Sequence, residues 1–419
     1  MKNVILDNRP ADIAIDGGKF SRIVAAGEFE QNFPADGYEC LDCSGLTAIP
    51  GFINSHTHAA MTLMRGVGED LLFYDWIDRI WDIEKNLDSD FVYWGTKVAC
   101  LEMIRTGTTV YNDQYWFPRA ARKATAEMGI LPAISHIFLN QGDAAKGQSQ
   151  KEECIRLYEE SREWGGSAIF TISFHSVYSV SEDLILWATE FARTHGLKLH
   201  IHVSETEKEN KDCIAAHNGL SPVKYLNSLG VLGPDVIAAH TIWLDDKDVE
   251  ILGEHGVSCV HNINSNLKLA SGYKFRASEL KEAGANLCLG TDGCASSNNL
   301  DILEALKTAA IVQKAWREDP SVMPLDELMA MATVNGARAL GLNSGRIEEG
   351  LRADICLVDT HNSFFLSPAP FLANLVYSSH SDCIRTVIAG GKVVMKDRVI
   401  PGEEEILSNA AKVLTQLKK

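Results

Sequence analysis

The sequence of 419 residues lacks several features that would assign it to a membrane, an export pathway or a nucleic acid. It has no run of about eighteen apolar residues, so it predicts no membrane-spanning helix. Its first residues lack the apolar stretch and the small-residue cleavage site of a signal peptide. Basic side chains are fewer than acidic ones: the sequence has 39 Lys and Arg and 56 Asp and Glu, which gives a net charge of −17. Nucleic-acid binding draws on clustered Lys and Arg, so this balance argues against a nucleic-acid partner.

The ten cysteines are scattered and form no set of pairs at the spacing of a zinc knuckle. Most of them lie within apolar, strand-like segments, for example Cys259, Cys288 and Cys356. This distribution is typical of reduced, buried thiols, and it predicts a cytoplasmic protein.

The length and the pattern of the two chain ends predict one large and one small unit. A chain of 419 residues exceeds the roughly 250 of a single (β/α)₈ barrel without reaching two full domains. Residues 1–50 and 347–401 consist of short strand-like runs separated by glycine turns, which predicts a small β-sandwich domain built from both ends. Residues 402–419 have apolar positions at helical spacing and predict a C-terminal helix.

Residues 51–346 alternate between short apolar runs and segments of helical length, the outline of an α/β fold with a (β/α)₈ TIM barrel. The C-terminal ends of barrel strands meet at one face, where such enzymes place their chemistry. All eight runs end in a polar residue: Phe52–Asn54, Thr109–Asp113, Ala133–His136, Phe170–His175, Leu199–His202, Ile237–His240, Ser258–His261 and Leu287–Asp292.

A candidate metal site begins with His56 and His58, which directly follow the first run. Residues two apart on an extended strand face the same side, and imidazole suits zinc. His202, His240 and Asp292 close three further runs, and three imidazoles with one carboxylate would surround one zinc and leave a position for water. The residues alone leave His240 open as a ligand. The alternative, packed core histidines, would have to explain several at equivalent strand ends.

Glu205 lies three residues after His202. A carboxyl beside a metal can move protons between an attacking water and a substrate, whereas a salt-bridged loop residue is the alternative. Aromatic residues after the first two strands could cover a flat heterocycle or simply pack the rim helices; they are Trp76, Trp81, Trp116 and Phe117.

Seven stretches, in order along nearly the whole chain, carry a resemblance to a known family: Pro50–Met61, Leu63–Gly66, Ile83–Glu84, His202–Thr206, Ala239–His240, His261–Gly272 and Leu289–Gly293. On these stretches the sequence resembles the amidohydrolase superfamily, and within it the S-adenosylhomocysteine/methylthioadenosine deaminase-like branch. The resemblance implies one zinc ion per chain, for which another divalent transition metal could substitute. The metal ligands that it implies are His56, His58, His202 and Asp292.

The resemblance also implies roles for the neighbouring residues. Glu205 would handle the proton at the ring nitrogen beside the attacked carbon, and His240 would contact the water at the metal rather than the metal. Glu84 matches a position that binds ribose hydroxyls, and His175 matches a histidine that contacts substrate. The alternatives are a helix-surface charge for Glu84 and a packed rim histidine for His175.

The sequence departs from the homocysteine-accepting members, which resemble one another in arginines that hold the amino-acid carboxylate. Here the third run ends in His136, and the loop of residues 140–148 contains no arginine. Without the paired donors of a guanidinium, the grip on a carboxylate is weak.

The expected partner is a small aminated heterocycle, and the expected activity is a zinc-dependent hydrolytic deaminase. Its substrates would be adenosine-type nucleosides such as 5'-methylthioadenosine, 5'-deoxyadenosine or S-adenosylhomocysteine, and its products the inosine-type nucleoside and ammonia. The alternatives are a deaminase of a free base or pterin, a triazine-type hydrolase and an inactive binding scaffold; the presence of Glu205 favours deamination. The sequence is compatible with a homo-oligomer.

Overall fold

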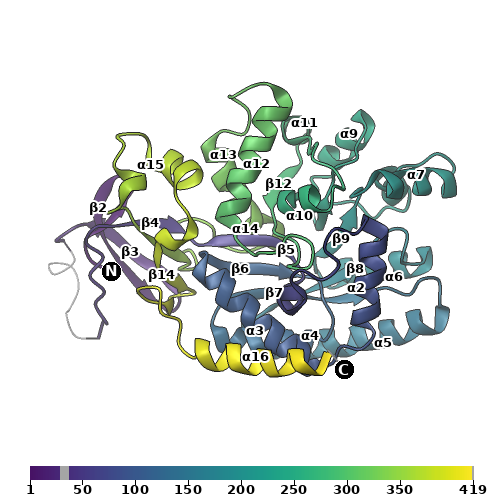
Figure 1. The fold of residues 1–419 in the computed structure, drawn as a ribbon, viewed down its shortest axis with the longest axis horizontal. Coiled ribbons are helices and arrows are strands. Elements are labelled where there is room, and N and C mark those ends of the chain that lie inside the picture. Colours follow the sequence, from purple (N-terminus) through teal and green to yellow (C-terminus); the bar gives the residue numbers. More distant parts are fainter. Residues whose placement is uncertain (29–36, 418–419) are drawn as a thin grey trace.

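The computed structural model describes residues 1–28 and 37–417, and its strands form two separate sheets (Figure 1). The larger is an eight-stranded parallel sheet in which each strand pairs with its neighbours in chain order. Helices alternate with these strands, so the predicted TIM barrel is confirmed. The strands are β5 (Phe52–Thr57), β6 (Thr108–Asp113), β7 (Leu131–Phe138), β8 (Ile169–Phe174), β9 (Leu199–Val203), β10 (Val236–His240), β11 (Ser258–His261) and β12 (Asn286–Leu289).

The helices surround the parallel strands and bury apolar faces against them (Figure 1). Those of seven residues or more are α2 (Phe73–Glu84), α3 (Ser89–Arg105), α4 (Pro118–Met128), α5 (Ala144–Ser161), α6 (Glu182–Thr194), α7 (Glu207–Ala216), α8 (Pro222–Ser228), α9 (Asp246–Glu254), α11 (Ala277–Ala283), α12 (Ile302–Arg317), α13 (Leu325–Met331), α14 (Val334–Leu340) and α16 (Glu403–Leu417). The short elements are η1 (Ala59–Met64), α10 (Ile263–Lys268), η2 (Ser363–Phe365), α15 (Phe371–Ala373), η3 (Asn374–Ser378) and η4 (Ser381–Cys383).

The first and last barrel strands, β5 and β12, are joined by side chains and loop backbone. The amide of Asn54 donates to Thr291 Oγ1 (2.7 Å), and its carbonyl oxygen accepts from the Thr291 backbone N–H (3.1 Å). One step further along, the Asp292 N–H donates to the His56 carbonyl (3.1 Å). A side chain at Gly290 would meet the backbone nitrogen of His56 at 3.0 Å and Asn262 Oδ1 at 2.5 Å, so the close approach at this seam favours glycine.

The second sheet combines strands from both ends of the chain, as expected for the small β domain. Its order is β15-β14-β13-β4-β1-β2-β3. Strand β4 joins the two ends because it pairs in parallel with β1 and antiparallel with β13. The strands are β1 (Val4–Leu6), β2 (Arg9–Asp16), β3 (Lys19–Ala25), β4 (Leu46–Pro50), β13 (Ile355–Asp359), β14 (Ile384–Ala389) and β15 (Lys392–Met395).

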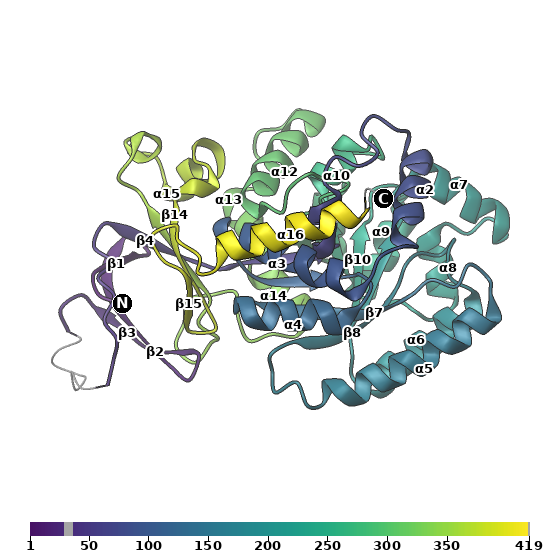
Figure 2. The ribbon, with the colours of Figure 1, turned by 60° about the horizontal axis from the view of Figure 1, so that its bottom comes forward.

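The C-terminal helix α16 lies alongside α3 on the outside of the barrel (Figure 2). An ion pair between Arg105 and Glu403 joins the two helices. Residues 29–36 of the predicted small domain and residues 418–419 of the predicted helix lie outside the described residues.

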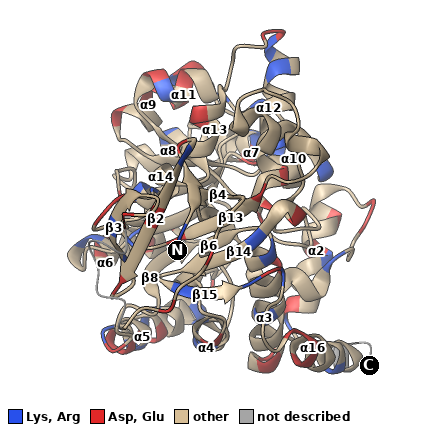
Figure 3. Ribbon diagram, turned by 90° about the vertical axis from the view of Figure 1, so that its left-hand side faces the viewer, with Lys and Arg blue, Asp and Glu red and all other residues tan. Residues whose placement is uncertain are grey.

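The distribution of charges, the character of the helices and the state of the cysteines can be compared with the expectations from composition. Acidic and basic positions are interspersed over the helices in view in Figure 3. None of the helices in residues 1–28 and 37–417 combines the length and the apolar character that a bilayer span requires. All ten cysteines are free thiols, and all but Cys40 are buried.

Candidate active site

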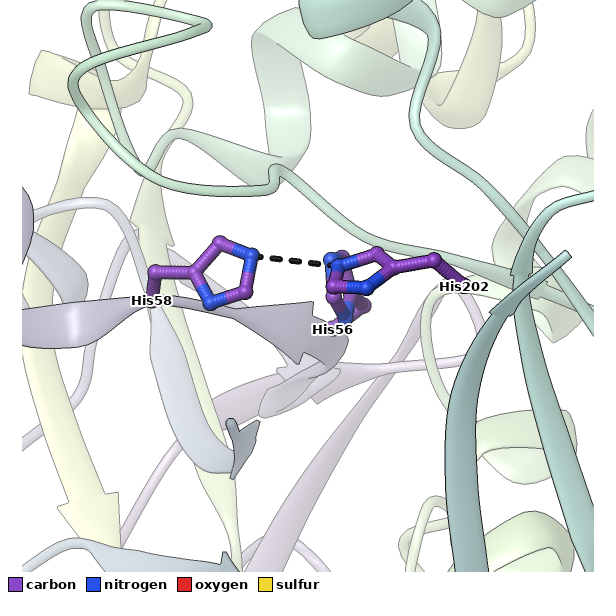
Figure 4. A group of neighbouring side chains, drawn as sticks. All are labelled: His56, His58 and His202. Atoms are coloured by element: carbon purple, nitrogen blue, oxygen red, sulfur yellow. Dashed lines mark hydrogen bonds between the residues drawn. The ribbon is translucent and has the colours of Figure 1, made fainter. Parts of the chain in front are cut away.

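Three histidines from the first and fifth barrel strands converge at the C-terminal end of the barrel (Figure 4). His56 lies on β5 and His58 just beyond its end, while His202 lies on β9. The Nε2 atoms of His58 and His202 are 3.3 Å apart. Asp292, which follows β12, places its Oδ1 atom 3.3 Å from His56 Nε2 and 3.2 Å from His58 Nε2. The structure therefore brings together all four residues that were predicted as metal ligands.

The spacing of these donor atoms fits a metal ion. Four ligands at about 2.0–2.1 Å from a tetrahedral zinc lie about 3.3 Å from one another. The Nε2 atom of His56 is buried and has no hydrogen-bond partner in the part of the chain that the structure describes. A buried imidazole nitrogen with an unused lone pair, set among two further imidazoles and a carboxylate, is the chemistry of a metal site.

The second nitrogen of each histidine is held by the surrounding barrel. His58 Nδ1 donates to the Gln114 carbonyl (2.6 Å), and His202 Nδ1 donates to the His175 carbonyl (2.8 Å). His56 Nδ1 lies 2.8 Å from Nε2 of His200. With Nδ1 as the donor in each case, Nε2 is left with its lone pair toward the metal.

Sequence reasoning missed His200 and Gln114 in this role. His200 could have been found, because it lies two residues before His202 on β9 and so shares its face. Gln114 contributes only its main chain to His58, which no residue pattern signals.

Asp292 is oriented by two serines. Its Oδ2 atom accepts hydrogen bonds from Ser265 Oγ (2.6 Å) and Ser296 Oγ (2.9 Å), which turns Oδ1 toward His56 and His58. The backbone of Asp292 adopts the left-handed conformation (φ 63°). A non-glycine residue in this region costs roughly 1–3 kcal/mol and persists only where its surroundings enforce it.

His240 lies at the same centre, at the end of β10. Its ring stacks on that of His202 with centroids 5.4 Å apart, and its Nδ1 accepts from Asn266 Nδ2 (3.1 Å). Burial lowers the pKa of His240 to about 3, so its imidazole is neutral at pH 7. The structure places one donor atom of His240 within 4.8 Å of donor atoms of His56 and Asp292, so distance alone does not separate a ligand from a residue beside the ligands.

Glu205 completes the inner group. It is buried, and its Oε1 atom lies 3.6 Å from His240 Nδ1. Burial, together with the nearby charge of Asp292, raises the pKa of Glu205 well above its ordinary value. A raised pKa favours the protonated carboxyl, which is the form that can donate a proton.

The comparisons with known proteins agree with this geometry. A model of the amidohydrolase family matches residues 47–394. The chain belongs to the amidohydrolase family. It is 43% identical to a 5'-deoxyadenosine deaminase of Methanoregula boonei, over 97% of this chain and 92% of that protein. It is 41% identical to a 5-methylthioadenosine/S-adenosylhomocysteine deaminase of Archaeoglobus fulgidus, over 88% of this chain and 86% of that protein.

Solved structures with bound zinc share the fold of this amidohydrolase. An adenosine deaminase from Xanthomonas campestris superimposes with a TM-score of 0.90 at 28% identity, covering 97% of this chain and 94% of its own. An atrazine chlorohydrolase from Arthrobacter aurescens superimposes with a TM-score of 0.87 at 22% identity, covering 98% of both chains. The latter likeness concerns the fold alone.

The active site of this amidohydrolase opens into a narrow inner cavity of about 60 Å³. Helix α2 supplies one wall of the cavity with Trp76, Trp81 and Glu84, and the strand ends supply the other. An outer chamber of about 690 Å³ adjoins it. Six residues line both spaces: Trp81, Glu84, Tyr115, Trp116, Ile137 and Leu139.

Glu84 and His175, the two predicted substrate contacts, both face the inner cavity of this amidohydrolase. The indole N–H of Trp116 donates to Glu84 Oε2 (3.1 Å), and the Tyr115 side chain is also hydrogen-bonded to the Glu84 carboxyl group. His175 Nδ1 is hydrogen-bonded to Ser179 Oγ (2.9 Å), and Trp81 contacts its ring edge-on with centroids 5.8 Å apart. Of the four predicted aromatic residues, three line the inner cavity, while Phe117 lines only the outer chamber.

The outer chamber contains an arginine that the sequence analysis missed. Arg119, in the first turn of α4, lines the chamber together with His136, Lys146 and Glu153. Its guanidinium is already engaged, because it donates to Glu153 and, through Nε, to Glu160 (2.7 Å). No sequence pattern indicates that α4 lies beside the loop after β7, so the position of Arg119 in this chamber could not be predicted.

Proposed function

We propose that this amidohydrolase is a zinc-dependent deaminase that hydrolyses adenosine-type nucleosides, with one zinc ion per chain. The single observation that carries the proposal is the placement of two carboxyl groups along one path. Glu205 lies beside the metal ligands, and Glu84 lies where the inner cavity meets the outer chamber. The names of the relatives, 5'-deoxyadenosine deaminase and 5-methylthioadenosine/S-adenosylhomocysteine deaminase, support the same substrate class.

The zinc would be held by Nε2 of His56, His58 and His202 and by Oδ1 of Asp292, where it would supply a water of lowered pKa as the nucleophile. Asp292 would accept the proton that the attacking water loses when the water oxygen bonds to C6 of the purine. Glu205 donates its proton to N1, so negative charge does not build up on the ring. The neutral imidazole of His240 contacts the oxygen bound to C6. The C6–N bond then breaks as Asp292 passes its proton to the amino group, which leaves as ammonia. The C6 hydroxyl returns its proton to Glu205, and the inosine-type product keeps the proton on N1.

The two connected spaces support a nucleoside over a free base. A purine in the inner cavity, against Trp81 and His175, would direct its sugar toward the Glu84 carboxyl group. The ribose hydroxyls can donate to this carboxylate, and each such charge-assisted bond contributes about 1.5–3 kcal/mol. The group on the 5' carbon then falls in the outer chamber.

The charges of the outer chamber favour an uncharged 5' group. Burial lowers the pKa of His136 to about 4, so its imidazole brings no positive charge at neutral pH. Arg119 and Glu153 are paired with each other, and Lys146 offers a single ammonium without the paired donors of a free guanidinium. We therefore propose that 5'-methylthioadenosine, 5'-deoxyadenosine and adenosine are used more efficiently than S-adenosylhomocysteine.

The test is kcat/KM for these four compounds on one zinc-loaded preparation, followed by ultraviolet change and ammonia release. Adenine, pterins and an aminated triazine are assayed beside them. Turnover of the free base or pterin without turnover of any nucleoside would replace the proposal with the free-base alternative. Turnover of the triazine alone would select the triazine hydrolase, and no turnover by zinc-loaded protein would select an inactive scaffold.

A further inference from the structure

The turn that carries Glu205 is attached to the first turn of α7 in an unusual way. Thr206, the N-cap of this helix, accepts a hydrogen bond from the Glu209 N–H (3.0 Å), as in the capping box of a helix. In a capping box the glutamate three residues on returns to the N–H of the N-cap residue itself. Here the Glu209 carboxylate also reaches further back: the Glu205 N–H donates to Oε2 (2.7 Å) and the Ser204 N–H donates to Oε1 (3.1 Å).

The backbone that Glu209 holds is strained. Ser204 adopts the left-handed conformation (φ 53°), directly after the end of β9. Its carbonyl accepts from the backbone N–H groups of Ile242 (3.1 Å) and Trp243 (3.0 Å) in the loop after β10. The Ser204 peptide groups are therefore fixed on both sides, and this is the condition under which such a conformation persists.

Glu209 itself does not reach the substrate space. Its side chain is 3% exposed and is absent from the lining of both the inner cavity and the outer chamber. Burying a carboxylate costs free energy unless it accepts hydrogen bonds, and Glu209 accepts them from the backbone of the turn. Glu209 therefore acts on the conformation of this turn and does not contact the substrate.

We infer that Glu209 is a positioning residue that aims the Glu205 carboxyl at the ring of the substrate. This inference rests on the proposed function, because it assigns to Glu209 an effect that is exerted through the proton donor. The hydrogen bonds fix the backbone at Ser204 and Glu205, and that backbone determines where the Glu205 side chain leaves the turn. When the bonds are lost, Ser204 relaxes toward an ordinary conformation and Glu205 moves away from His240.

The experiment is a double-mutant cycle with Glu209→Gln and Glu205→Gln. The amide introduced by Glu209→Gln offers one acceptor oxygen where the carboxylate offers two, so one of the two N–H groups loses its partner. Misplacing a reacting group by about 1 Å costs on the order of 10²-fold. We expect kcat of the single variant Glu209→Gln to fall by about that factor, with unchanged KM and unchanged zinc content. In the Glu205→Gln background the same change should have little further effect, because the group that it positions is already disabled.

A matched control is Asp248→Asn. Asp248 is also buried, lies at the N3 position of a helix (α9) and accepts a backbone N–H, that of Asp245 (3.0 Å), but it lies away from the inner cavity. Its replacement should leave kcat unchanged. All rates are expressed per zinc-loaded, folded molecule, and Glu209→Asp, which keeps the charge but shortens the side chain, provides a second variant if the first folds poorly.

The outcomes separate the inference from the proposed function. A fall in kcat for Glu205→Gln without one for Glu209→Gln would overturn the inference alone. Additive losses in the double variant would also overturn it, because Glu209 would then act independently of Glu205. Full activity of Glu205→Gln would overturn the proposed role of Glu205 itself.

Discussion

The inner cavity and the outer chamber share a wall that includes Glu84, but the polar groups at the centre of each lie in different parts of the fold. The inner groups lie at strand ends, and each has a fixed partner: His58 is held by a carbonyl and Asp292 by two serines. The charged groups of the outer chamber lie on helices and loops, and Arg119 is engaged with neighbouring glutamates. In the proposed function the reaction would therefore depend on the barrel strands, and the choice of the 5' group on the surrounding helices and loops.

The largest expected effect comes from removing the metal, which acts on the inner cavity alone. Chelation should abolish turnover completely, and one equivalent of zinc per chain should restore it. His56, His58, His202 and Asp292 form one set of donor atoms, which fits a single ion. Metal analysis alongside the titration checks the count. Two equivalents bound at the barrel mouth, both needed for activity, would contradict the prediction.

The next effect is that of Glu205→Gln, which disables the proton donor and leaves the metal ligands intact. General acid–base groups contribute about 10²–10⁴ in rate, so kcat should fall by at least about 10²-fold. The zinc content should stay at the level of the unaltered protein, measured on the same samples. Loss of zinc from this variant would mean that Glu205 is itself a ligand.

A smaller effect is expected at the junction of the two spaces. Glu84→Ala removes the acceptor of the ribose hydroxyls, and at about 1.5–3 kcal/mol for each bond the loss in kcat/KM for nucleosides should be on the order of 10²-fold. Activity with a free base, if measurable, should change far less, because it never makes these bonds. The comparison of the two losses is the measurement. Equal losses for base and nucleoside would indicate that Glu84 supports the cavity wall instead.

The smallest effect concerns the outer chamber, where we expect substrate preference not to change with pH. Since burial lowers the pKa of His136 to about 4, its imidazole stays neutral between about pH 6 and 8. The ratio of kcat/KM for 5'-methylthioadenosine to that for S-adenosylhomocysteine should therefore be flat over this range. An imidazole with its ordinary pKa would gain charge as the pH falls, and the ratio would then decrease toward pH 6. Measuring both substrates at each pH cancels effects on the common chemistry.

Sequence patterns sufficed for residues that the fold places by rule. His56, His58 and His202 were predictable because strand periodicity and the common C-terminal edge of the barrel determine where their side chains meet. Glu205 was predictable from its spacing to His202. The structure assembles these residues with Asp292 and His240 at one centre.

The rest of the site depends on contacts between elements far apart in the chain. Ser265 and Arg119 belong to segments whose approach to Asp292 and to the β7 loop follows from packing, which has no signature in the sequence. The role of Glu209 was hidden for a different reason. Its spacing from Thr206 is that of an ordinary capping box, and only the structure shows the carboxylate extending to Ser204 and Glu205.

The seam between β5 and β12 has a consequence for how the protein loses its structure. Asn54 and Thr291, which join the seam, are 237 positions apart in the chain, and the adjacent His56 and Asp292 are both in the ligand group. A bound ion would therefore cross-link the two ends of the barrel chain much as a disulfide closes a long loop. Because an ion that binds only the closed barrel stabilises it by mass action, thermal unfolding should shift with free zinc concentration.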